Sequence, residues 1–163
     1  MRNRSSSPAR PSRSRWAVIA GVGQAHWFFG NAYEAMVDMP RLLADAQPNR
    51  SPGLLRAGSP LRYYLPAAPV TVVATAAALV DSWRSGGDRR AITTAAAGTA
   101  SAAALTAYLV KRVNLRLLRS GKPLSATERR SLATTWHRGN LARLAALTVA
   151  AWALRRTGYG AGR

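Results

Sequence analysis

Three long stretches without a charged residue are the feature that most constrains this chain. Residues 16–33, 63–80 and 91–110 contain no Lys, Arg, Asp or Glu. Each is about 18 to 20 residues long, the length that an α-helix needs to cross the hydrocarbon core of a bilayer. A fourth apolar run, residues 144–154, is shorter and reaches that length only if it begins near Trp136 and includes Arg143. The pattern predicts an all-α, transmembrane four-helix bundle.

The predicted domain covers residues 16–156, with helices at residues 16–37, 66–82, 90–113 and 125–156. Ser125 and Glu128 form a capping-box sequence at the start of the fourth helix. Residues 1–15 consist mainly of Arg, Ser and Pro, which predicts a disordered basic tail. Residues 157–163 form a short C-terminal tail. A cleaved signal peptide is the alternative for the first stretch, but its apolar residues continue through Phe29, which favours an anchor helix.

Charge gives the second constraint. The 163 residues include 24 Lys and Arg against 6 Asp and Glu, for a net charge of +18. Such a balance alone suggests a soluble basic nucleic-acid-binding protein, which stays one of three hypotheses. The charges lie mostly in the tail and between the apolar stretches, where arginine suits anionic head groups. We therefore expect a lipid bilayer as partner and no nucleic acid. The chain has no cysteine, which excludes disulfides and thiol catalysis.

A soluble bundle is the alternative fold, but it needs a polar outer face on each helix. Residues 91–110 offer only Thr, Ser and Gly for such a face, and these small residues suit close packing in lipid. We therefore expect a multi-pass protein of the cell membrane. Lys and Arg are equally numerous on the two sides of the expected topology, so the positive-inside rule does not decide orientation. The basic tail, next to the first helix, favours a cytoplasmic N-terminus.

Polar residues inside the apolar stretches fall into two stripes. In the first helix, steps of three or four place these residues on one face: Gln24, Trp27, Asn31, Glu34 and Asp38. The fourth helix has a similar stripe of Trp136, Asn140, Arg143 and Leu147. A lone charge at membrane depth is costly, so such groups face inward and pair. The stripes predict a Glu34–Arg143 ion pair that Asn31 and Asn140 support, with Gly23 and Gly30 allowing close helix contact.

The ends of the helices predict a polar pocket near one membrane face. The expected lining residues are Gln24, His26, Trp27, Asn31, Asn114, Trp136 and Asn140. Such sites between helices are where bundles keep ligands. The alternative is a non-enzymatic structural or partner-binding protein, in which the ion pair only fixes the helix register. A two-His-one-carboxylate iron site from His26, His137 and Glu34 is disfavoured, because helical spacing turns His26 away from Glu34.

Four of these residues form a pattern that is similar to that of a known protein family. Asn114 follows the third helix, and Trp136, Asn140 and Arg143 open the fourth. In this, the chain resembles the anthrone-oxygenase-like family of small four-helix membrane proteins, over about residues 16–156. Arg112 and Asn140 depart from that pattern, because the family often has Pro and His there. The resemblance implies a four-helix membrane fold and, for some members, oxidation of anthrones to anthraquinones.

No dinucleotide fingerprint, P-loop or nucleophile elbow occurs in the sequence, so we expect no cofactor and no metal. A cofactor-free oxygenase acting on anthrone-like aromatics would need a base and a cation beside a small acidic aromatic ligand. Glu34 or His137 is the candidate base, and Arg143 is the candidate cation. Those three residues are the catalytic hypothesis.

Overall fold

The computed structural model describes residues 14–45, 62, 64, 66–119 and 124–157. Within these residues every regular element is helical, which confirms the all-α class. The elements are α1 (Arg15–Met36), α2 (Met39–Asp45), α4 (Ala67–Arg84), α5 (Arg89–Leu109), the π-helical turn η2 (Val110–Asn114), α6 (Leu115–Arg119) and α7 (Ala126–Arg156). Most of the predicted N-terminal tail, Tyr63 and residues 158–163 lie outside the described residues.

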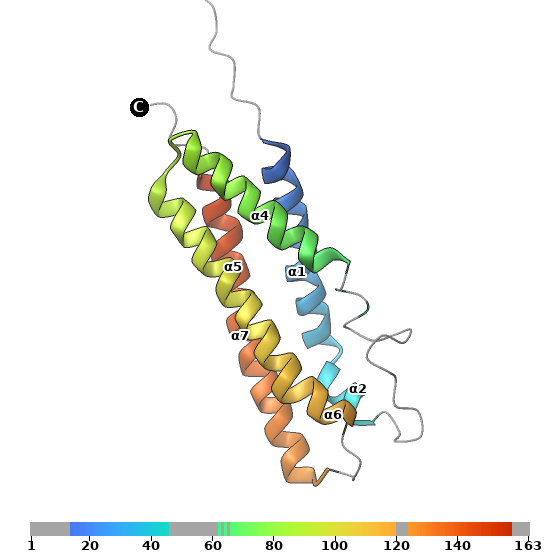
Figure 1. The fold of residues 1–163 in the computed structure, drawn as a ribbon. Helices are drawn as coiled ribbons and strands as arrows, with labels where there is room; N and C mark the ends of the chain where they lie inside the picture. Colours follow the sequence, from blue (N-terminus) through green and yellow to red (C-terminus); the bar gives the residue numbers. More distant parts are fainter. Residues whose placement is uncertain (1–13, 46–61, 63, 65, 120–123, 158–163) are drawn as a thin grey trace, which may run out of the picture.

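Four long helices form an antiparallel bundle (Figure 1). α1 packs against α4 and α7, while α5 packs against α7 and α4. α4 covers only the half of the bundle in which α1 begins and α7 ends (Figure 1). At the other end, α2 and α6 lie together beside the start of α7. The chain therefore places the end of α1, the end of α5 and the start of α7 at the same end of the molecule.

Local signals explain where the long helices begin. Asp88 caps α5 by accepting hydrogen bonds from the backbone N–H groups of Arg90 and Ala91. Ser125 and Glu128 make the predicted capping box at α7, each side chain bonding the other residue's backbone. The hydrogen bond from the Ser125 backbone N–H holds the pKa of Glu128 below its ordinary value. Gly86 has a φ of 77°, which permits the tight connection between α4 and α5.

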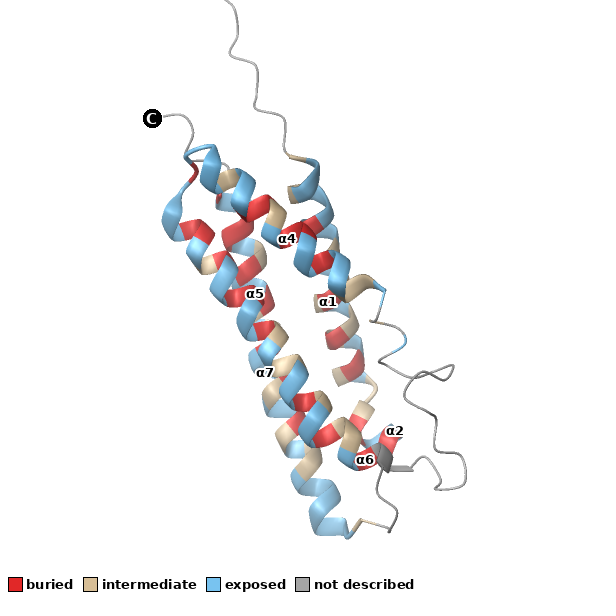
Figure 2. Ribbon diagram, viewed as in Figure 1, coloured by how far each residue is buried: buried red, intermediate tan, exposed pale blue. Residues whose placement is uncertain are grey.

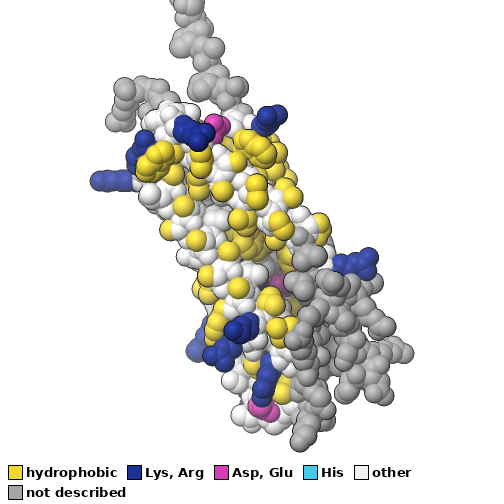
Figure 3. Space-filling model, in the orientation of Figure 1, with side chains coloured by type: hydrophobic (Ala, Val, Ile, Leu, Met, Phe, Trp, Pro, Cys, Tyr) yellow, Lys and Arg dark blue, Asp and Glu magenta, His cyan; other side chains and the backbone are white. Residues whose placement is uncertain are grey.

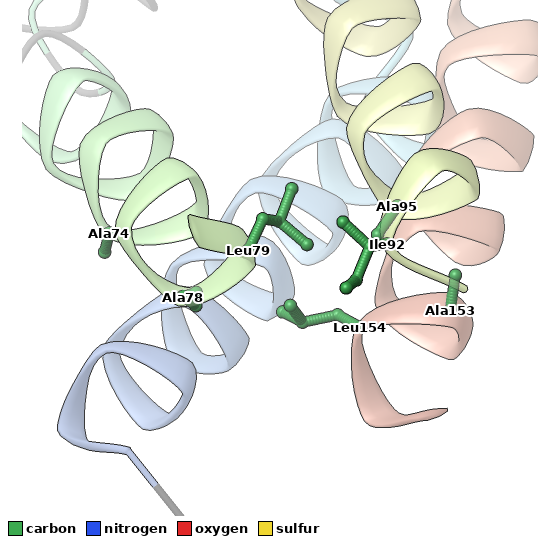
Figure 4. Packing of buried hydrophobic residues seen from close by; sticks show 8 residues of the cluster. Ala74, Ala78, Leu79, Ile92, Ala95, Ala153 and Leu154 are labelled. Atoms are coloured by element: carbon green, nitrogen blue, oxygen red, sulfur yellow. The ribbon is translucent and has the colours of Figure 1, made fainter. Parts of the chain in front are cut away.

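The bundle core is built largely from alanine. Buried residues follow the inward face of each helix (Figure 2). One cluster joins all four long helices near the end where α1 begins; Figure 4 shows Leu79, Ile92 and Leu154 meeting among alanines there. Gly98 contributes to this close packing, because a Cβ there would meet the Ala146 carbonyl and the Ala150 side chain. Small residues thus bring the helix backbones near one another.

The outward faces carry many large apolar side chains. Val22, Phe29 and Leu141 are 67%, 68% and 70% exposed. Figure 3 shows hydrophobic and uncharged side chains over much of the middle of one face, with most of the Lys and Arg toward the two ends and a basic side chain at the right edge at mid-height. Of the helices in the described part of the chain, none combines the length and the mean hydropathy of a membrane span.

Two features differ from the prediction. The third helix does not stop at residue 113: it continues from α5 through η2 into α6, up to Arg119. The predicted stripe on α1 is buried from Gln24 to Glu34, but Asp38 departs from it. Asp38 lies beyond the end of α1 with a φ of 50°, and this left-handed residue turns the chain into α2. Its side chain therefore points away from the interior stripe.

Candidate functional site

The two predicted polar stripes face each other inside the bundle. On α1 the buried residues include Gln24, Trp27, Asn31 and Glu34. The buried residues of α7 include Trp136, Asn140, Arg143 and Leu147. Helical spacing puts each set on one face, and packing of α1 against α7 turns those faces together.

The predicted Glu34–Arg143 ion pair is present. Arg143 Nη2 lies 3.5 Å from Glu34 Oε2, and the two residues are only 5% and 8% exposed. The Tyr64 side chain donates a hydrogen bond to Glu34 from the segment that precedes α4. A Cβ on Gly30 would collide with the Tyr64 hydroxyl, so this glycine gives Tyr64 room beside Glu34.

Asn140 is the main partner of Arg143. Its Oδ1 accepts hydrogen bonds from Arg143 Nη2 at 2.6 Å and from Nε at 3.1 Å. The Asn140 amide in turn donates to the backbone carbonyl of Asn31 at 3.0 Å. Arg143 Nη1 reaches Thr106 Oγ1 on α5 at 3.4 Å. The network therefore ties α7 to both α1 and α5 through one guanidinium group.

Some acceptors near this network are not used. Asn31 donates through Nδ2 to the Trp27 carbonyl at 2.7 Å, but its Oδ1 is buried and has no hydrogen-bond partner in the described residues. Asn114 Oδ1, at the end of η2, is also buried and has no hydrogen-bond partner in the described residues. Asn114 follows Thr106 by eight residues, so it lies about two helical turns from the Arg143 network.

Gln24 belongs to a separate polar cluster deeper in the bundle. Its Nε2 donates to Thr99 Oγ1 on α5 at 3.0 Å and to Thr75 Oγ1 on α4 at 3.5 Å. Both threonine hydroxyls donate to the carbonyl four residues earlier in their own helix. Gln24 lies two helical turns from Asn31 on α1, so the structure divides the predicted pocket residues between two clusters.

The remaining predicted site residues lie elsewhere. His137 points outward, with its Nε2 3.1 Å from Asp38 Oδ1, and its side chain is 45% exposed. It follows Trp136 on a different face of α7 from Arg143, so it does not meet Glu34. The His26 ring is half-buried and lies edge-on to the Tyr64 ring at 6.3 Å. Among the described residues no group of three His, Asp or Glu side chains is placed to hold a metal ion.

The two tryptophans of the stripes pack as core residues. Trp27 contacts Ala102 and Leu147 in one apolar cluster. Trp136 contacts a second cluster that includes Leu109 and Val113. Trp27 precedes Asn31 by four residues and Trp136 precedes Asn140 by four, so each cluster lies about one helical turn from the charged network. Both tryptophans are therefore part of the apolar packing next to the ion pair.

Sequence reasoning missed the threonines. Thr106, Thr75 and Thr99 supply the hydroxyl groups that Arg143 and Gln24 contact, yet none was a candidate. The spacing of Thr71 and Thr75 by four residues in an otherwise apolar helix is the signal that could have found the second cluster.

Comparison with known proteins adds no relative: no family model, no curated protein and no solved structure matches this chain.

Proposed function

We propose that the chain is a small multi-pass protein of the cell membrane, with the Glu34–Arg143 network as a ligand site inside its four-helix bundle. The polarity of the bundle supports membrane insertion. Large apolar side chains face outward while amide, carboxylate and guanidinium groups face inward. In water the reverse arrangement is favourable, because apolar surface is then buried and charges are hydrated. In lipid, polar groups gather between helices.

The polar residues that lower the mean hydropathy of these helices are the ones that lipid would not touch. Gln24, Asn31 and Glu34 on α1 are each at most 8% exposed. Their neighbours on the outer side, Val22, Phe29 and Tyr33, are each more than 60% exposed. On α7 the spanning part would begin near Trp136, and the charged first turns would stand outside the hydrocarbon. This distribution agrees with a bundle that presents an apolar surface to acyl chains.

The ligand class that we propose is a small aromatic molecule with an acidic proton. Glu34 is the group that could accept this proton, and Arg143 is the cation that would stabilise the resulting anion. Tyr64 and Asn140 supply the neighbouring hydrogen-bonding groups. His137 is not part of this assignment, because it faces outward. The resemblance to anthrone oxygenases names the reaction to test first, and the buried Glu34–Arg143 contact is the observation that carries the proposal.

A structural role is the second candidate, and the bonding of Arg143 favours it. All three nitrogens of the guanidinium group already have partners, in Asn140, Glu34 and Thr106. A group satisfied in this way can hold α1, α5 and α7 in register without any ligand. The two roles differ in one outcome. A ligand site binds a small molecule, whereas a structural network changes only stability when it is altered.

Membrane insertion is tested by alkaline carbonate extraction of membranes that contain the full chain. We expect the protein to stay in the pellet. Release into the supernatant, together with DNA retention that falls steeply with salt, would instead support the soluble nucleic-acid-binding alternative.

The ligand site is tested with the protein purified in a mild detergent. We expect a hydroxylated anthrone to raise the thermal midpoint of the wild type. It should also raise the midpoint of the control variant Arg138→Leu, which replaces an exposed arginine on α7, the helix that carries Arg143. Glu34→Gln should lose this shift, and with it any conversion to the anthraquinone followed by absorbance and oxygen uptake. An equal shift in Glu34→Gln and the wild type would refute the assignment of this site. No shift in either would leave the structural role as the better account.

A further inference from the structure

One end of the bundle carries three exposed tryptophans, each with an arginine at its ring. The Cζ atom of Arg89 lies 3.6 Å from the centroid of the Trp83 ring, and the Cζ atom of Arg156 lies 3.9 Å from the centroid of the Trp152 ring. Arg15 lies 5.9 Å from the Trp16 centroid. The three indoles are 39% to 53% exposed. We call this set of three pairs the Trp–Arg belt.

The fold brings these pairs together from separate parts of the chain. Trp16 stands at the start of α1, Trp83 at the end of α4 and Trp152 near the end of α7. All of these helix termini lie at the same end of the bundle (Figure 1). The other two tryptophans of the chain, Trp27 and Trp136, are 7% and 1% exposed. Every solvent-accessible indole is therefore at this end.

Charge at this end is strongly positive. The described, exposed charged residues are six arginines against two aspartates: Arg15, Arg84, Arg89, Arg90, Arg155 and Arg156 against Asp81 and Asp88. Asp88 is occupied with capping α5. A guanidinium group that lies over an indole face keeps its N–H edge free, and that edge matches the oxygens of a phosphate.

We infer that the Trp–Arg belt is a binding surface for the phosphate groups of anionic phospholipids in one leaflet. This inference rests on the proposed membrane insertion and says which surface meets the head groups. Indoles prefer the boundary between acyl chains and head groups, and arginines beside them would reach outward to phosphate. The spacing along α5 agrees: Arg89 and Lys111 are separated by 22 residues, or about 33 Å, close to the thickness of the hydrocarbon core.

The opposite end of the bundle provides a matched control. Arg112, Arg129 and Arg130 are exposed there and have no tryptophan partner, since every exposed indole belongs to the belt. We compare two triple variants that lose the same charge. The belt variant is Arg15→Gln, Arg89→Gln and Arg156→Gln. The control variant is Arg112→Gln, Arg129→Gln and Arg130→Gln.

The full-length protein is placed in nanodiscs of phosphatidylcholine with increasing shares of phosphatidylglycerol. Tryptophan fluorescence and the thermal midpoint are followed at low and high salt, and circular dichroism checks that each variant keeps its helices. We expect phosphatidylglycerol to raise the midpoint of the wild type and of the control variant. The belt variant should need roughly tenfold more of the anionic lipid for half of the effect.

Three results would overturn this inference: no preference for the anionic lipid, an equal loss in both triple variants, or the same stabilisation from inorganic phosphate in neutral nanodiscs. The last result would mean that the belt binds the free anion rather than the lipid. None of these results would contradict membrane insertion, which the carbonate extraction tests separately.

Discussion

Replacing Arg143 by leucine removes the cation from the centre of the bundle and leaves Glu34 with the Tyr64 hydroxyl as its donor. Taking away one partner of a buried ion pair costs about 3–5 kcal/mol, because the other charge stays buried without compensation. Arg143→Leu should therefore be among the most destabilising single substitutions in the chain. The matched control is Arg138→Leu, which changes an exposed arginine of the same helix and should cost less than about 0.5 kcal/mol.

The distances predict that Glu34 and Arg143 contribute unequally to the free energy of unfolding. Glu34→Gln removes a contact of 3.5 Å, whereas the guanidinium keeps Asn140 Oδ1 at 2.6 Å and 3.1 Å. We therefore expect a loss of about 1–2 kcal/mol, near the lower end for a hydrogen bond to a charged group. The double variant Glu34→Gln/Arg143→Leu should cost no more than Arg143→Leu alone, because no buried charge remains.

The assay is equilibrium unfolding in mixed micelles, followed by helical circular dichroism, for the wild type, the two single variants and the double variant. The double-mutant cycle should show non-additivity of at least about 1 kcal/mol, the smallest loss expected for Glu34→Gln. The reasoning is refuted if Glu34→Gln costs as much as Arg143→Leu, or if the two losses add. Additive losses would mean that Arg143 is held by Asn140 and Thr106 alone, whereas equal losses would mean that Asn140 does not compensate for the missing carboxylate.

Three further predictions use the same measurement. Gly30→Ala should destabilise the protein by about 1–3 kcal/mol, since the new methyl group displaces Tyr64 from Glu34, while Gly21→Ala on the same helix has open space and should be neutral or slightly stabilising. Gln24→Leu should cost little or even stabilise, because it removes a buried amide oxygen that has no hydrogen-bond partner in the described residues; a loss as large as that of Arg143→Leu would contradict this view. The first turn of α7 should loosen in acid: the lowered pKa of Glu128 means that its contribution is present above its ordinary value of 4.5 and is lost as the pH falls below it. Hydrogen exchange of the amides of that turn should show this loss in the wild type and no such pH dependence in Glu128→Gln.

Much of the candidate site could be predicted because its residues break a simple pattern. Glu34 and Arg143 are ionisable groups among apolar neighbours, and helical spacing alone placed each on an inward face. The partner Thr106 could not be found in this way. A threonine in an alanine-rich helix can face lipid, the core or another polar group. Only the packing of α5 on α7 places Thr106, rather than another threonine of α5, next to Arg143.

The positions of His137 and Asp38 have a different explanation. Asp38 lies one helical turn after Glu34, so spacing assigned it to the stripe on α1, whereas His137 was a candidate because it lies at the same end of the bundle as Glu34. Asp38 takes a left-handed backbone conformation that ends α1, and a periodic pattern cannot foresee where a helix stops in this way. The two side chains then meet outside the bundle.

The π-helical turn at Val110–Asn114 keeps the buried side chains before and after it on the same face of the helix. In a regular α-helix, residues four apart rotate by about 40° relative to each other, so Leu109 and Leu117 would point about 80° apart. All three residues of the series Leu109, Val113 and Leu117 are nevertheless buried in one cluster with Trp136. The wider turn absorbs the drift with one additional residue. If the same residues formed plain α-helix instead, Leu117 would rotate by about 80° out of the core. A chain shortened by one residue within this turn would place Leu109 and Leu117 seven positions apart, only about 20° from alignment, so it should lose the π-turn and keep Leu117 in the core.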